Sequence, residues 1–126
     1  MKAICIKQPW AGLIAEGEKT IETRTWQTTH RGPLLIVASL GLVQPMYNSM
    51  KDWYIKEHGL LPITYQVRGA ALCIVDLYDC KPMTRRDQKA ACIDIYPGAF
   101  SWFLRDIKII KPFAVKGRLN LFDVSI

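Results

Sequence analysis

The segment GEKTIETRTW, residues 17–26, brings together three charged side chains that could act on one ligand: Lys19, Glu22 and Arg24. A lysine in a partly dry cleft can hold a phosphate or polarise a carbonyl, and a carboxylate beside it can accept a proton or bind a nucleobase amino group. An arginine can fix that carboxylate by a bidentate pair and keep it ionised. Lys19 and Glu22 are therefore the candidate catalytic residues, and Arg24 is expected to position Glu22. The alternative is a solvated strand carrying a weak surface ion pair.

The three side chains converge only if the chain turns in a particular way before the strand. Alternation along an extended segment at residues 20–26 puts Glu22 and Arg24 on one face and would send Lys19 to the opposite one. A glycine with positive φ can rotate the chain and bring the lysine round. We therefore expect Gly17 to be the pivot of this segment.

The segment and its surroundings resemble the ASCH domain family, a branch of the PUA-like fold. GEKTIETR fits the GxKxxExR signature of that family. The resemblance runs through three blocks in order, KQPWAGLIAEGEKTIETRTW, RGPLLIVAS and FSWFLRDIKIIKPFAVKGRLNLFDV, and so spans nearly the whole chain. It implies a small β-barrel flanked by helices, with a cleft beside the motif, in a family associated with RNA binding and RNA metabolism.

The resemblance also implies which residues line the cleft. The motif contributes Gly17, Lys19, Glu22 and Arg24; the preceding block contributes Gln8, Pro9 and Trp10; and Ser39 and Trp102 match cleft-associated positions. Trp10, Trp26 and Trp102 could offer a stacking face to an unpaired base. Packing in the core is the alternative for each of the three indoles.

Three functions are compatible with this cleft. The leading hypothesis is binding of RNA or a modified nucleoside over Lys19, Glu22 and Arg24. The second is hydrolysis, because some relatives are amidohydrolases acting on N4-acetylated cytidine and ribonuclease activity occurs within the family. The third is a non-catalytic interaction scaffold with a vestigial cleft.

One departure from the family pattern bears on the hydrolase hypothesis. In the small amidohydrolase relatives a threonine stands where this chain has Glu22, and a separate acid lies in a later helix. Asp87 and Asp94 are the candidates to replace that acid. A mechanism that uses a hydroxyl nucleophile therefore cannot be carried over to this chain. A water activated by Glu22, with Lys19 stabilising the oxyanion, remains possible.

Composition restricts the class of protein. The 126 residues suit a single domain, residues 1–126, and carry a net charge of +6, which favours a polyanionic partner. The four cysteines form no CxxC pair and no histidine stands at ligand spacing, so we expect no metal, no cofactor and no disulfide. The apolar runs are far shorter than the roughly 20 residues of a membrane-spanning helix, and no secretory signal is evident, so we expect a cytoplasmic protein.

Hydrophobic periodicity predicts the elements that position the motif. We expect strands at residues 2–7, 20–26, 34–40, 69–80, 101–110 and 115–124, with Pro112 ending the fifth. Helices are expected at residues 9–16, at residues 44–58 and from Thr84, which with Asp87 could form a capping box. The fold class is therefore α+β: a small, mainly antiparallel β-barrel of about six strands flanked by two or three short helices.

Overall fold

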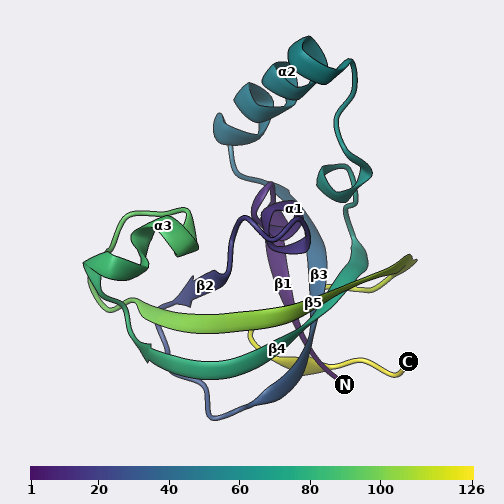
Figure 1. Cartoon of the computed structure of the whole chain (residues 1–126). Helices are drawn as coiled ribbons and strands as arrows, with labels where there is room; N and C mark the ends of the chain where they lie inside the picture. The colour runs from purple at the N-terminus through teal and green to yellow at the C-terminus, as the bar shows by residue number, and fades with distance from the viewer.

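The computed structural model of the chain describes residues 1–126 and is organised around one six-stranded sheet (Figure 1). The strands are β1 (Lys2–Gln8), β2 (Ile21–Arg24), β3 (Gly32–Leu42), β4 (Ala70–Pro82), β5 (Phe100–Ala114) and β6 (Phe122–Asp123). Their order is β2-β5-β4-β3-β1-β6, and every neighbouring pair is antiparallel except β1 with β3. The predicted α+β class is confirmed, with a sheet that curls without closing, since β2 and β6 remain its two edges.

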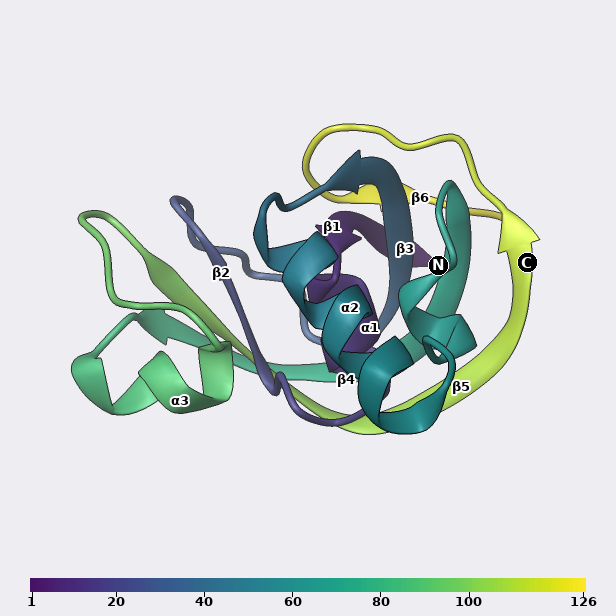
Figure 2. The same ribbon diagram turned by 90° about the horizontal axis from the view of Figure 1, so that it is seen from above.

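The helical elements lie between the strands in sequence. They are α1 (Trp10–Ala15), α2 (Met46–His58) and α3 (Gln88–Ala91), with short 3-10 turns η1 (Ile63–Tyr65) and η2 (Arg85–Asp87). The sheet wraps around α1, which contacts β1, β3, β4 and β5 (Figure 2). None of these helices is long and apolar enough to cross a membrane.

The core is divided by the alternating side chains of β3. Leu34, Ile36 and Ala38 belong to the main cluster, which also contains the buried residues of α1. Leu35 and Val37 point to the other side and join a smaller cluster under the C-terminal segment. Because both faces of β3 are covered, its sequence is continuously apolar instead of alternating.

Helix α2 confirms the predicted helix and adds no residue to the buried core. It begins and ends close to the predicted residues 44–58, and Gly59 follows it with φ +80°. Its apolar residues, however, do not pack into the core: no residue of α2 is buried, and Trp53 is 53% exposed. The helix stands apart from the sheet in Figure 1.

The prediction that Pro112 ends the fifth strand was wrong, because β5 continues to Ala114. A proline inside a strand is tolerated where no ladder bond needs its missing N–H. Pro112 lies where the pairing of β5 with β4 shifts register, between the partners Ile109–Cys73 and Phe113–Ala71. On the other side β2 pairs only with Phe100–Phe103, so this part of β5 is a sheet edge.

The first and last edge strands are shorter than predicted. Strand β2 stops at Arg24, and β6 contains only Phe122–Asp123, antiparallel to β1. Asn120 has φ +58°, a left-handed conformation that interrupts an extended strand just before β6 begins.

Candidate functional site

Gly17 turns the chain between α1 and β2 as predicted. It has φ +81°, and the N–H groups of Glu18 and Lys19 both donate to the carbonyl of Leu13, at 2.9 and 3.0 Å. This tight turn folds the chain back under the end of α1. The side chain of Lys19 therefore enters the interior on the side where Glu22 lies.

Lys19 is one of the most deeply buried polar residues, with 1% exposure. Its Nζ lies 3.7 Å from Oε1 of Glu22, donates to the carbonyl oxygen of Ala91, and is 5.6 Å from the centroid of the Trp10 ring. Burial lowers the pKa of Lys19 from its ordinary value, and the Glu22 carboxylate acts in the opposite direction. The alternative of a solvated surface pair is therefore contradicted.

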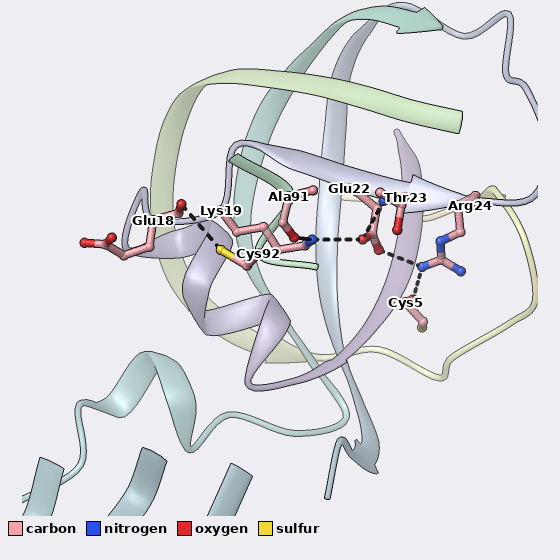
Figure 3. Close-up of polar contacts among 8 residues, drawn as sticks. All are labelled: Cys5, Glu18, Lys19, Glu22, Thr23, Arg24, Ala91 and Cys92. Carbon is pink, nitrogen blue, oxygen red and sulfur yellow. Dashed lines mark hydrogen bonds and ion pairs between the residues drawn. The ribbon is translucent and has the colours of Figure 1, made fainter. Parts of the chain in front are cut away.

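The carboxylate of Glu22 is held through both oxygens (Figure 3). Oε1 accepts a hydrogen bond from the backbone N–H of Thr23 at 3.0 Å, and Oε2 accepts one from Nη2 of Arg24 at 3.1 Å. The same Nη2 donates to the carbonyl of Cys5 at 2.9 Å, which ties β2 to β1. Arg24 thus anchors Glu22 as predicted, but by one nitrogen instead of the expected bidentate pair.

A pocket of about 360 Å³ opens in front of this charged array. Its walls are Cys5, Ile6, Lys7, Trp10, Glu22, Thr23, Arg24, Thr25 and Tyr96. Trp10, Glu22 and Arg24, three of the predicted site residues, are among these walls. Lys19 does not, because its ammonium lies behind Glu22, facing Ala91 and the Trp10 ring.

Several residues of the pocket wall carry hydrogen-bond donors that have no protein partner. Nε1 of Trp10 is buried and unpaired. Arg24 is 27% exposed, and its hydrogen bonds all come from Nη2, so Nε and Nη1 are free to bind a ligand. The exposed Lys7 adds a second cation without an ion-pair partner. An anionic or carbonyl-bearing ligand matches these donors, and the fixed Glu22 supplies an acceptor.

Gln8 and Pro9, expected at the cleft, are instead structural. Gln8 is fully buried; its Nε2 donates to the carbonyls of Thr64 and Val67 at 2.8 and 2.9 Å, and its Oε1 accepts from the N–H of Gly12 at 2.9 Å. These bonds hold the start of α1 against the segment around η1. Pro9 is buried as the residue that precedes α1.

Trp102 and Ser39 also lie away from the pocket walls. Trp102 is fully buried, donates from Nε1 to the carbonyl of Trp26 at 3.3 Å, and packs edge-on against the Trp26 ring with centroids 4.8 Å apart. Both indoles therefore take the packing alternative. The hydroxyl of Ser39, on β3, is buried without a partner and lines none of the pockets.

Neither candidate for the later acid lines the pocket. Asp87 accepts from the N–H of Thr84 at 3.0 Å and from the hydroxyl of Ser101 at 2.9 Å, so it caps the turn η2 as the sequence predicted. Asp94 is exposed. No group of three or more histidine, cysteine or acidic side chains is placed to hold a metal ion, and all four cysteines are free thiols.

Six of the nine wall residues were not predicted, and two of these six, Lys7 and Tyr96, bear on ligand binding. Lys7 shares a face of β1 with Cys5 because they are two residues apart, and this period-2 relation could have identified it once β1 was placed beside the motif. Tyr96 reaches the pocket from the segment between α3 and β5. No sequence signal predicts that approach, because it depends on the tertiary packing of β2 against β5.

Solved structures of ASCH proteins share this fold. A crystal structure of ASCH from Zymomonas mobilis matches with a TM-score of 0.64 at 14% identity, covering 98% of this chain and 87% of that one. A single-substitution variant of the Zymomonas mobilis protein matches with a TM-score of 0.60 at 13% identity, covering 98% and 89%. The curled sheet wrapped around α1 is thus a PUA-like fold of the ASCH type.

Sequence comparison identifies the family directly. The ASCH domain profile matches residues 4–114, so the chain belongs to the ASCH domain family. Activating signal cointegrator 1 of Homo sapiens is 31% identical over 130 residues, and that of Mus musculus is 33% identical over 134 residues. Each alignment covers 97% of this chain but 22% of the relative, so the chain spans about a fifth of the length of these two proteins.

Proposed function

We propose that this ASCH domain binds a nucleotide unit of single-stranded RNA in the pocket in front of Glu22. The observation that carries the proposal is the indole N–H of Trp10, a residue of the pocket wall: this N–H is buried and has no hydrogen-bond partner in the protein. A buried donor without an acceptor is costly, and a ligand oxygen or ring nitrogen would satisfy it.

The charges of the pocket support the same ligand class. Arg24 has two unused guanidinium nitrogens and Lys7 has no ion-pair partner, so both can approach a phosphate. The Glu22 carboxylate is the one acidic group on the walls, and it can accept from a nucleobase amino group. The family's association with RNA binding and the net charge of +6 are consistent with this proposal.

No observation favours hydrolysis over binding. Each carboxylate oxygen of Glu22 already accepts one hydrogen bond, and its remaining lone pair can accept from a water as well as from a ligand amino group, so Glu22 alone does not distinguish the two functions. Stabilisation of an oxyanion by Lys19 would need its ammonium at the pocket wall, and it lies behind Glu22. Binding requires no rearrangement of these groups, whereas the proposed acid–base chemistry does. The scaffold alternative leaves the unpaired donors of Trp10 and Arg24 without a role.

The proposal is tested by fluorescence titration with single-stranded RNA and free nucleotides at low and moderate salt. Trp10→Phe keeps an aromatic ring over Lys19 but removes the N–H, so we expect affinity to fall roughly five-fold, about 1 kcal/mol. Trp53→Phe, on the exposed helix α2, is the matched control and should bind as the wild type does. Absence of binding by the wild type, or an unchanged affinity of Trp10→Phe, would contradict the proposal.

A further inference from the structure

A second pocket lies on the other side of Tyr96. It has a volume of about 480 Å³, and Met83, Pro97 and Phe100 are among its walls. Tyr96 lines both this pocket and the one in front of Glu22, so the two are adjacent. No charged residue lines the second pocket, in contrast to the first.

Tyr96 is held in place by the backbone on both sides. The N–H of Ala99 donates to the carbonyl of Tyr96 at 3.2 Å, closing a turn in which Gly98 has φ +78°. The N–H of Ile95 donates to the side chain of Gln88 at 2.8 Å, and the carbonyl of Ala99 accepts from Met83 at 2.9 Å. The backbone that carries Tyr96 is therefore held by hydrogen bonds within the protein.

One pocket is charged and the adjacent pocket is apolar, which suits a nucleic acid strand, because each nucleotide joins a charged phosphate to a base with a flat apolar face. We propose that the apolar pocket beside Tyr96 takes the base of a second nucleotide, so that the ligand of this site is a two-nucleotide unit of single-stranded RNA. This inference rests on the function proposed above. An acetyl group on a single base is a poorer match, because it would fill only a small part of about 480 Å³.

The test compares two ligands that carry the same phosphates. One is the dinucleotide pApA. The other is pApA with one base removed to leave an abasic sugar, and it is prepared in two forms, one for each position. We expect pApA to bind the wild type at least ten-fold more tightly than one of the abasic forms. Tyr96→Phe should keep this ratio, because its ring still walls the apolar pocket.

Two variants remove the second pocket in different ways. Tyr96→Ala deletes the shared wall, and Pro97→Glu places a carboxylate in the apolar pocket at an exposed turn position that does not line the first pocket. Both should reduce the ratio of affinities to about one. Pro112→Glu introduces the same charge at an exposed proline that lines none of the pockets and should leave the ratio unchanged.

The outcomes separate this inference from the proposed function. If both abasic forms bind the wild type as tightly as pApA does, the second base has no site and the inference is wrong, while nucleotide binding stands. If the ratio is high but survives Pro97→Glu and Tyr96→Ala, the second base lies elsewhere and the inference is also wrong. If neither AMP nor any dinucleotide binds, the proposed function itself fails.

Discussion

At the scale of single residues, the site is a buried row of charges in which Glu22 stands between two cations. Lys19 approaches one carboxylate oxygen and Arg24 the other, and the two cations differ in exposure, 1% against 27% of the side chain. A buried ammonium without a counter-charge is strongly unfavourable. Glutamate at position 22 is therefore required to keep Lys19 charged inside the protein, whether or not a ligand is bound.

This arrangement predicts a large stability effect for Glu22→Gln. The substitution keeps the size of the side chain but removes the negative charge beside Lys19, so the free energy of unfolding should fall by about 3 kcal/mol. Urea denaturation measures it. Asp123→Asn, which removes the acid of the exposed pair with Lys2, is the control and should change stability by less than about 1 kcal/mol. Similar effects of the two substitutions would mean that the row of charges is not coupled to folding.

A buried thiol provides a pH-dependent prediction. Burial raises the pKa of Cys73 from 9.0 to about 12. Above pH 9 the thiol loses its proton in the unfolded chain but keeps it in the folded protein. The contribution of this thiol to the free energy of unfolding is therefore fully present below pH 9 and decreases as the pH rises toward 12. The slope due to this group is at most about 1.4 kcal/mol per pH unit.

Cys73→Ala should lack this contribution. We expect its stability at neutral pH to be lower, because a buried side chain is shortened, but its decline at alkaline pH to be shallower than that of the wild type. Urea denaturation of both proteins from pH 9 toward pH 12 gives the two slopes. Parallel curves would show that the thiol titrates normally in the folded state.

At the scale of elements, α1 and α3 determine where the motif lies. The end of α1 and Gly17 direct Lys19 inward, and the last carbonyls of α3 receive it: Ala91 accepts from Lys19 Nζ and Ala90 from the N–H of Thr20 at 2.9 Å. A cation is favourable beside the unpaired carbonyls at a helix C-terminus. The short helix α3 therefore has a definite function in placing β2.

Helix α1 is in turn packed closely against η1, and this contact gives a testable prediction. A Cβ atom at Gly12 would lie 2.4 Å from Cδ1 of Tyr65 and 2.9 Å from the backbone oxygen of Thr64. Tyr65 is fully buried and cannot move aside easily. Gly12→Ala should therefore reduce the free energy of unfolding by about 1 to 3 kcal/mol, measured by urea denaturation.

Gly41→Ala is the matched control for this substitution. The nearest atom to its added Cβ would be Cε of Lys7, at 3.3 Å, which belongs to a flexible and exposed side chain. We expect a change within about 0.5 kcal/mol. If Gly12→Ala were equally mild, the packing of α1 against η1 would be looser than the structure indicates.

At the scale of the whole molecule, the basic residues outnumber the acidic ones and are dispersed along the chain. Lysine and arginine number 17 against 11 acidic residues, but several basic side chains are paired, as Arg105 is with Asp76 at 2.9 Å. The pocket itself offers two cations, Lys7 and Arg24. The affinity for RNA should therefore depend only weakly on salt concentration, because few phosphates contact basic side chains.

This gives a quantitative prediction for binding at different salt concentrations. Two phosphate contacts correspond to a slope of about −1.4 in a plot of log affinity against log salt for a single strand. Lys7→Gln should reduce the magnitude of that slope by about 0.7. Lys51→Gln, on α2 and away from the pocket, should leave it unchanged. A much steeper slope for the wild type would mean that RNA contacts a larger basic surface than this pocket.

Much of this fold could be predicted from the amino-acid sequence, because helix, strand and turn preferences depend on residues that are close along the chain. The class of fold, most elements and the Thr84–Asp87 cap follow from periodicity and backbone preference, whereas the convergence of Lys19 with Glu22 is expected only with the family resemblance and a turn at Gly17. The family resemblance added the PUA-like fold and the position of a cleft. It also carried over residues such as Gln8 and Trp102 that the fold uses for other purposes.

Which side chains line the pocket depends on contacts between segments that are distant in the sequence. Whether Gln8 reaches the pocket or binds the carbonyls of Thr64 and Val67 depends on segments more than fifty residues away. The positions of Tyr96 and Lys19 also depend on distant segments. Tyr96 reaches the wall of the pocket from the segment before β5, and Lys19 donates to the carbonyl of Ala91. Alternation along a strand fixes the face of a side chain, but its burial depends on what packs against that face, and this is a property of the whole chain.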